Sequence, residues 1–184
     1  MIAEIDALVA AWLQGHASAN LSATMRLVSQ WNATPLLLLA TMVLGIVLLW
    51  RRDHEALWIL LLAVPAGTAL NHLLKHTIRR PRPDDVAGVA TTDYAFPSGH
   101  VATATLFYGF VAVWILLRAR SWPAKAAAVI IAMALVATVA ASRLVLRAHH
   151  LSDVVAAAIG GLAWLCLSVG VVRRGRRKKP RDGG

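Results

Sequence analysis

The sequence PSGHVATATLFYGFVAVWILL, residues 97–117, joins a short polar cluster to an apolar run. No Asp, Glu, Lys or Arg occurs from Val101 to Leu117, a run of 17 residues. An α-helix rises about 1.5 Å per residue and needs roughly 17 to 25 apolar residues to cross the hydrocarbon core of a bilayer. The stretch therefore predicts a membrane-spanning helix that begins directly after Pro97 to His100.

The same pattern occurs four more times along the chain. The other uncharged runs contain 17, 19, 17 and 19 residues, and they are Thr34 to Trp50, Ala56 to Leu74, Ala126 to Ser142 and Val154 to Val172. Over all 184 residues the chain is 58% hydrophobic, with a mean hydropathy of +0.62. A soluble helical bundle is the alternative, but five uncharged runs leave few positions for the polar, solvent-exposed helix faces that such a bundle needs. We predict an all-α polytopic membrane bundle of about five transmembrane helices over residues 34–172.

The first 33 residues have a different pattern. Glu4 and Asp6 stand where a signal peptide carries positive charge, and no long apolar core follows. Apolar residues recur there at helical spacing, namely Ile2, Ile5, Leu8, Val9, Trp12 and Leu13, then Leu21, Met25 and Val28. We expect residues 1–33 to form one or two amphipathic helices, which either lie in the outer membrane interface or pack against the bundle.

Basic residues are unevenly divided between the two sides that alternating spans create. One side carries 12 of the 19 Lys and Arg residues: Arg51, Arg52, Arg118, Arg120, Lys125 and seven in the tail 173–184. The positive-inside rule assigns this side to the cytoplasm. The net charge of +10 does not indicate a nucleic-acid partner. The basic tail contains no interleaved aromatic residue that could stack on bases, and the sequence shows no nucleic-acid-binding motif. A basic segment beside anionic lipid is the simpler interpretation of the tail.

The opposite side carries three polar clusters, each at the end of a span. They are Lys75 to Pro83, Pro97 to His100, and Ser142 to Asp153. Because the spans alternate in direction, all three clusters are expected on one membrane face, where they can form a single site. We expect Arg79, Arg80 and Arg147 to anchor helix ends at lipid headgroups. We do not expect this role for Lys75, Arg82 and Arg143.

Three cations and one helix start favour a phosphate ligand at this site. Lys75, Arg82 and Arg143 supply positive charge, and guanidinium groups suit bidentate contact with phosphate oxygens. Ser98 is a natural N-cap, and Gly99 allows a ligand close to the first free N–H groups of the helix. The sequence therefore predicts a cation-lined phosphate pocket.

Two histidines and one aspartate add reactive groups to the pocket. His149 and Asp153 are four residues apart where the last helix begins, so they share a face and can hydrogen-bond. A carboxylate that accepts one ring N–H leaves the other nitrogen free as a nucleophile toward phosphorus. His150 is the alternative nucleophile, although the spacing to Asp153 favours His149. His100, on another helix, is the candidate general acid.

No metal or other cofactor is expected, because the cations supply the electrostatic stabilisation of the phosphoryl group. His72 and His76 are four residues apart and, with His100, offer a metal-site alternative, but no ligand cluster has standard metal spacing. Asp84, Asp85 and Asp93 are interpreted as residues of a solvated loop. The single cysteine, Cys166, lies within the last span and has no possible disulfide partner in the chain.

These residues resemble the three-part signature of the type 2 phosphatidic acid phosphatase superfamily. The parts are Lys75 with six residues before Arg82-Pro83, then Pro97-Ser98-Gly99-His100, then Ser142-Arg143 with five residues before His149 and three more before Asp153. The resemblance implies a membrane lipid phosphatase with His149 as nucleophile, Asp153 orienting it and His100 as acid. It also implies phosphate binding by Lys75, Arg82, Ser98, Gly99 and Arg143. Members often have six spans, and here the amphipathic start replaces the first.

The resemblance also implies a substrate class and a location. The expected substrate is a lipid phosphate or diphosphate at the periplasmic face of a bacterial inner membrane, with undecaprenyl diphosphate first and phosphatidic acid or phosphatidylglycerol phosphate as alternatives. A lipid phosphotransferase and a non-enzymatic anion-binding or transport protein remain alternative functions. The sequence gives no indication of an oligomeric state.

Overall fold

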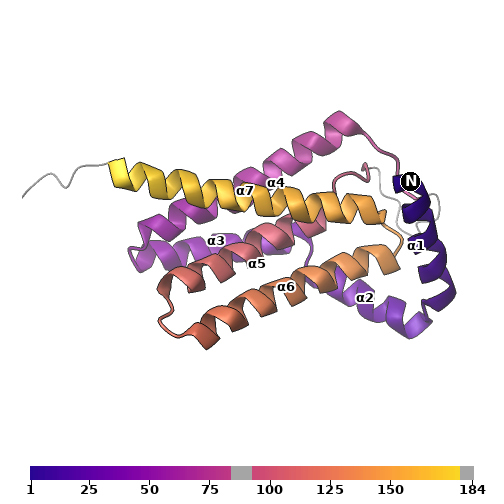
Figure 1. Ribbon diagram of the computed structural model, residues 1–184, viewed down its shortest axis with the longest axis horizontal. Coiled ribbons are helices and arrows are strands. Elements are labelled where there is room, and N and C mark those ends of the chain that lie inside the picture. Colours follow the sequence, from indigo (N-terminus) through magenta and orange to yellow (C-terminus); the bar gives the residue numbers. More distant parts are fainter. Residues whose placement is uncertain (84–92, 179–184) are drawn as a thin grey trace, which may run out of the picture.

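A computed structural model describes residues 1–83 and 93–178 of the chain, and within them it contains seven α-helices and no strand (Figure 1). The helices are α1 (Ile2–His16), α2 (Ala19–Trp31), α3 (Thr34–Trp50), α4 (His54–Ile78), α5 (Gly99–Arg118), α6 (Trp122–Val145) and α7 (Leu151–Lys178). Each uncharged run of the sequence lies within one of the helices α3 to α7.

Four of these helices are long and apolar enough to cross a membrane on their own: α4, α5, α6 and α7. Helix α3 has 17 residues and reaches that length only together with α2, from which it is bent by 41°. The described residues therefore provide four spans, or five if the bent pair counts as one. The expected all-α membrane bundle is confirmed.

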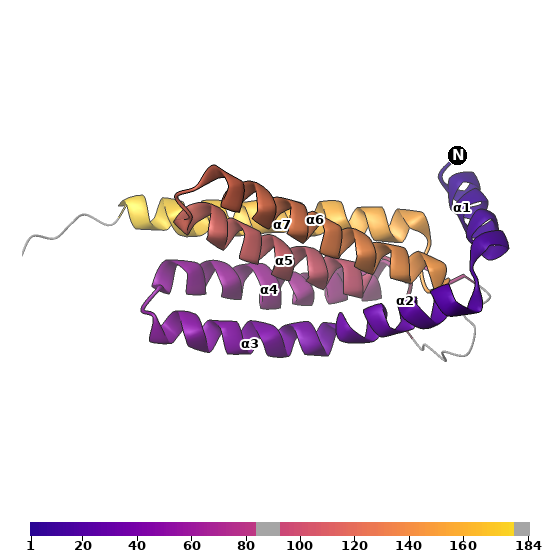
Figure 2. The ribbon, with the colours of Figure 1, turned by 90° about the horizontal axis from the view of Figure 1, so that it is seen from below.

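Helix α5 occupies the centre of the bundle and contacts α3, α4, α6 and α7 (Figure 2). Its first half is buried almost without interruption, because small residues such as Ala102 and Ala104 allow neighbouring helices to approach closely. Leu106 and Phe110 continue this buried face and pack with Leu60 and Leu165 of α4 and α7. The first residues of α5, at the Pro97 to His100 cluster, are thereby fixed at the middle of one bundle end.

The two ends of the bundle differ in what they carry. The α4–α5 and α6–α7 connections lie at one end together with α1, whereas the α3–α4 and α5–α6 connections and the end of α7 lie at the other (Figure 1). All three polar clusters are therefore at the same end, as alternating spans require. At the opposite end Asp53 caps α4 through the backbone N–H of Ala56 and pairs with Arg118 of α5.

Helices α1 and α2 both contact the bundle. Helix α2 packs along α6, and α1 crosses the bundle end, where it contacts α6 and α7 (Figure 2). Ile5, Leu8 and Trp12 of α1 are exposed, while the carboxylate residue Asp6 is only 4% exposed. Helix α1 therefore has one apolar face turned away from the protein and a buried charge on the face turned toward it.

Candidate active site

His149 lies in the short connection between α6 and α7, and Asp153 lies in the first turn of α7. Both side chains are buried, 2% and 0% exposed. Nδ1 of His149 is 3.8 Å from Oδ2 of Asp153, which is an ion-pair distance and too long for a hydrogen bond. The expected hydrogen bond is therefore absent from this structure, because the carboxylate is held by Arg80, through Oδ1 at 2.6 Å, and by the backbone N–H of His150, through Oδ2 at 2.9 Å.

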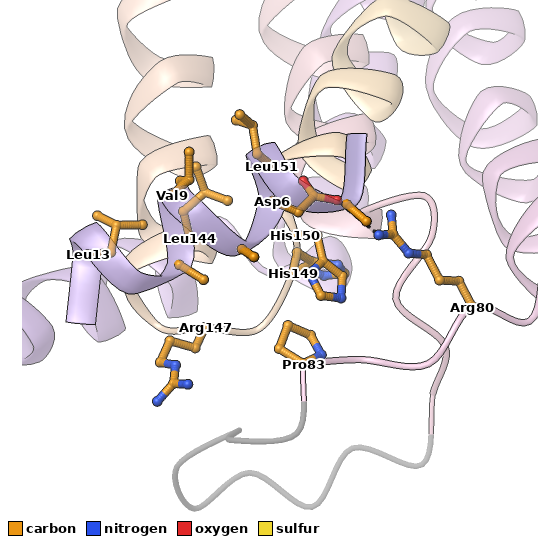
Figure 3. A pocket seen from close by; sticks show the side chains of 13 residues that line it. Asp6, Val9, Leu13, Arg80, Pro83, Leu144, Arg147, His149, His150 and Leu151 are labelled. Atoms are coloured by element: carbon orange, nitrogen blue, oxygen red, sulfur yellow. Dashed lines mark hydrogen bonds and ion pairs between the residues drawn. The ribbon is translucent and has the colours of Figure 1, made fainter. Parts of the chain in front are cut away.

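Burial lowers the pKa of His149 from 6.5 to about 4. Asp153 opposes this shift, and the positive charges of Arg143 and Arg82 reinforce it. The imidazole is therefore neutral at pH 7, which is the form a nucleophile requires. His150 also borders the cavity of about 170 Å³ beside His149 (Figure 3). Its backbone N–H donates to Oδ2 of Asp153.

His100 lies in the first turn of α5 and comes close to the other charged groups of the site. Its imidazole lies close enough to be affected by the charges of four other side chains, those of Arg143, His149, Lys75 and Arg82. These five residues come from three helices and two connections, and they are separated by up to 74 positions in the chain. The fold therefore brings together both candidate reactive histidines and all three candidate phosphate-binding cations.

Ser98 stands at the N-cap position of α5, but its hydroxyl does not cap the helix. The side chain is completely buried, and Oγ has no hydrogen-bond partner among the described residues. The backbone N–H of Ser98 donates to the carbonyl of Asp153 at 3.3 Å, which joins the starts of α5 and α7. A Cβ on Gly99 would make only ordinary contacts with Thr34 and Asn71, so packing alone does not require glycine there.

Lys75 and Arg82 are fixed by the segment that precedes Ser98. Nζ of Lys75 is 2.7 Å from Oδ2 of Asp93, and the lysine side chain is buried. Arg82 donates through Nε to the carbonyl of Asp93 and through Nη1 to the carbonyl of Ala148. Burial lowers the pKa of Arg82, with Asp93 and Asp153 opposing the shift.

Asp93 is a partly exposed loop residue, 41% exposed, and it also pairs with Lys75, which the sequence did not indicate. Burial raises the pKa of its carboxyl group, but the hydrogen bond and charge of Lys75 more than offset this, and the pKa lies below its usual value. Asp93 neutralises a cation that was expected to be free for phosphate. Asp84 and Asp85 lie outside the described residues.

Arg143 of α6 is held by a residue that the sequence did not indicate. Its Nη1 makes a short hydrogen bond to Oγ of Ser29 in α2, and Ser29 is buried. A lone serine near the end of an amphipathic helix gives no signal by which this contact could be predicted. The contact means that the N-terminal segment positions one of the candidate phosphate-binding arginines.

Arg80 does not serve as the expected headgroup anchor. Its Nη1 donates to Oδ1 of Asp153 and to Oγ of Ser152, each at 2.6 Å. Its Nη2 donates to Oδ2 of Asp6 at 3.0 Å, and Figure 3 shows these two side chains beside each other. The sequence carries a signal for Asp6, because this carboxylate shares helical spacing with Val9 and Leu13 on one face of α1. Burial raises the pKa of Asp6, but hydrogen bonds from Ser152 and Arg80 more than offset this and lower it overall.

The fold does not assemble the alternative metal site of His72, His76 and His100 in the part of the chain that the structure describes. Nε2 of His76 is 3.3 Å from Nε2 of His72, and the two rings are in contact. In residues 1–83 and 93–178 no group of three or more His, Cys, Asp or Glu side chains could hold a metal ion.

An apolar groove of about 340 Å³ lies next to the site. It runs between α4 and α7 over the small residues Gly67, Gly160 and Gly161, and it reaches Phe96 and Pro97 directly before Ser98. The groove therefore connects the apolar flank of the bundle with the loop that carries the buried Ser98 hydroxyl.

The fold is a multi-pass helical bundle with these groups at one end, and comparison with known proteins identifies the family. The family model described as the PAP2 superfamily matches residues 56–177, well over half of the chain. The chain belongs to this superfamily, and its described residues form a multi-pass bundle of membrane-length helices.

One solved structure with the same fold is the crystal structure of the first transmembrane PAP2 type phosphatidylglycerolphosphate phosphatase from Bacillus subtilis. The two structures align with a TM-score of 0.77 and 24% sequence identity, over 99% of this chain and 89% of that chain. This similarity confirms the fold. A search of curated proteins gave no significant match.

Proposed function

We propose that the protein hydrolyses a lipid phosphate or diphosphate at the extracytoplasmic membrane face, without a metal ion, through a phosphohistidine at His149. The observation that best supports this is the buried, neutral His149 beside Asp153, with Arg82, Arg143 and His100 within electrostatic range of one another. A neutral imidazole, an adjacent carboxylate and fixed cations are the groups that in-line phosphoryl transfer requires.

In the first step Nε2 of His149 attacks phosphorus, because Nδ1 faces Asp153. The P–N bond forms as the bond from phosphorus to the leaving oxygen breaks, and His100 gives a proton to that oxygen. Positive charge develops on the imidazole and is stabilised by Asp153. Lys75, Arg82 and Arg143 stabilise the phosphoryl oxygens, with Lys75 exchanging Asp93 for substrate. The Ser98 hydroxyl, which has no partner among the described residues, is a further hydrogen-bond donor to them.

In the second step His100 takes a proton from a water molecule that attacks phosphorus. The P–N bond breaks, inorganic phosphate forms and His149 returns to the neutral state. Transfer to a lipid acceptor would differ only in the nucleophile of this step, so product analysis with an added lipid alcohol distinguishes hydrolysis from transfer.

The groove between α4 and α7 supports a lipid substrate, because an apolar chain in it would lead to the phosphate-binding loop. Undecaprenyl diphosphate is the first candidate from the sequence. Phosphatidylglycerol phosphate is the second, because a structural neighbour that covers 99% of this chain is named for that substrate. Phosphatidic acid is the third.

Purified full-length protein in detergent, treated with a chelator, should release phosphate from at least one of these three lipids. Release from a soluble aryl phosphate should be slower, because that substrate leaves the groove empty. His149→Ala should lower kcat by roughly 1,000-fold or more, as removal of a nucleophile does. Saturable lipid binding without phosphate release, or full activity in His149→Ala, would contradict the proposal, and the former result would favour an anion-binding or transport protein.

We also propose that the tail from residue 173 lies in the cytoplasm of a bacterial cell and that the active site faces the periplasm. The uneven distribution of Lys and Arg supports this orientation.

A further inference from the structure

We infer that Asp6 of the N-terminal helix α1 is a positioning residue for the hydrolytic reaction, acting through Arg80 on Asp153 and His149. This inference rests on the proposed roles of His149 and Asp153. It gives α1 a function in the chemistry, in addition to any role at the membrane interface.

The first observation is that Asp6 of α1 accepts two hydrogen bonds from the first turn of α7. Its Oδ1 accepts the backbone N–H of Ser152 at 2.9 Å, and its Oδ2 accepts the Ser152 hydroxyl at 2.6 Å. Ser152 is the second residue of α7, where backbone N–H groups have no partner within the helix. Asp6 therefore caps α7 from another helix, one residue before Asp153.

The second observation is that one guanidinium group joins two buried carboxylates. Arg80 contacts Asp6 at 3.0 Å and Asp153 at 2.6 Å, and these side chains are 5% and 0% exposed. Without Asp6, the full charge of Arg80 would act on Asp153 alone. With Asp6 present, the three groups carry a net charge of −1 beside His149. This negative charge is what an imidazole that becomes positive during phosphoryl transfer requires.

The third observation is that, among the described residues, Asp6 does not contact those proposed to bind the substrate phosphate. Asp6 borders the cavity beside His149 (Figure 3). Its carboxylate contacts Arg80 and Ser152, which are not among the candidate phosphate-binding residues. Its loss should therefore affect the chemical step and leave substrate affinity nearly unchanged.

The test uses the full-length protein and compares Asp6→Asn, Asp6→Glu and Glu4→Gln. Asp6→Asn keeps the size and an oxygen acceptor but removes the charge, and it should lower kcat by roughly 10- to 100-fold with KM changed less than about threefold, as loss of an outer-shell partner does. Asp6→Glu restores the charge and should recover part of kcat. Glu4→Gln removes the same charge from the same helix at an exposed position, where the partner is the N-terminal amine, and should keep wild-type kcat.

A double-mutant cycle with Arg80→Ala tests the route through the guanidinium group. If Asp6 acts through Arg80, Asp6→Asn should have almost no further effect on kcat in the Arg80→Ala background. Wild-type kcat in Asp6→Asn, an effect mainly on KM, or fully additive effects in the cycle would overturn the inference. If His149→Ala keeps its activity, the proposed mechanism itself fails, whereas loss of activity in His149→Ala with normal activity in Asp6→Asn rejects only the role of Asp6.

Discussion

At the scale of single residues, the candidate active end contains the buried charges of Lys75, Asp6 and Asp153, and each is paired with a partly exposed partner. Lys75 is paired with Asp93, and Arg80 with Asp6 and Asp153. Removing one partner of such a pair leaves an uncompensated buried charge, which is far more costly than loss of an exposed pair. The residues around the candidate phosphate site are therefore expected to be sensitive to substitution even where they are not proposed to touch substrate.

The lowered pKa of His149 predicts a pH dependence of stability. The folded-state value of about 4 lies below the ordinary value of 6.5, so the unfolded chain binds a proton first as the pH falls. The free energy of unfolding should therefore decrease between pH 6.5 and about 4, by at most about 1.4 kcal/mol per pH unit from this group. Thermal unfolding in detergent from pH 7 to 4.5 should show this decrease.

The same measurement on His149→Gln should give a smaller decrease over the same range. Asp6 and Asp93 do not confuse the comparison, because their pKa values are lowered from 3.8 and they titrate below this window. An equal slope in the variant and the wild type would contradict the assignment of a depressed pKa to His149.

The contact between Ser29 and Arg143 predicts a graded loss of activity. Arg143→Ala removes a candidate phosphate-binding cation and should lower kcat/KM by roughly 100- to 1,000-fold, as loss of a transition-state donor does. Ser29→Ala leaves the arginine in place but removes its hydrogen bond on α2, and it should cost roughly 3- to 10-fold, in line with about 1 kcal/mol for one hydrogen bond. Steady-state kinetics on both variants provide the test, and equal losses would show that Ser29 matters for more than this bond.

At the scale of helices, close packing around α5 keeps the polar ends aligned. A Cβ on Gly67 of α4 would lie 2.7 Å from Cδ1 of Leu106 and 2.7 Å from Cδ1 of Trp164. The tryptophan cannot move away easily, because its Nε1 donates to the carbonyl of Leu62 at 2.9 Å. Gly67 therefore allows α4, α5 and α7 to meet at one point below the groove.

Gly67→Ala should consequently destabilise the protein, by about 1 to 3 kcal/mol from overpacking. Gly160→Ala is the matched control, because Gly160 is also a helical glycine that borders the groove but a Cβ there has nothing within 4 Å. The control should be neutral or slightly stabilising, since alanine favours helix more than glycine does. Thermal unfolding of the two variants in the same detergent measures the difference, and equal midpoints would contradict the packing argument.

At the scale of the whole molecule, the two ends of the bundle carry unequal numbers of basic residues. Ion pairs occur at both ends, since Arg80 pairs with Asp6 and Asp153 at the end with α1, and Arg118 pairs with Asp53 at the other. The proposed orientation in the membrane rests on the numbers of Lys and Arg, 12 on the side of the tail and seven on the side of the candidate active site.

Cysteine labelling tests this orientation in a Cys166→Ser background, which removes the native thiol. Gln14→Cys in α1 and Ser121→Cys in the α5–α6 connection introduce exposed thiols at opposite ends. In intact bacterial spheroplasts a membrane-impermeant maleimide should label Gln14→Cys, and it should label Ser121→Cys only after permeabilisation. The reverse pattern would contradict a periplasmic active site.

The sequence by itself determined the fold class and the main groups of the candidate site. Five uncharged runs require helices, because backbone groups in lipid must be satisfied within their own segment. Alternation of those helices is enough to bring Lys75, Ser98, Arg143 and His149 to one end. The spacing between His149 and Asp153 also follows from the helical repeat alone.

Only the tertiary structure decided how the charges at that end pair. Arg80 and Asp93 looked like a headgroup anchor and a loop residue, yet both are partners of site residues. Asp6 and Ser29 lie far from the motifs in sequence and contact the site only because α1 crosses the bundle end and α2 packs on α6. Such contacts depend on packing angles between helices, and no local pattern in the sequence specifies those angles.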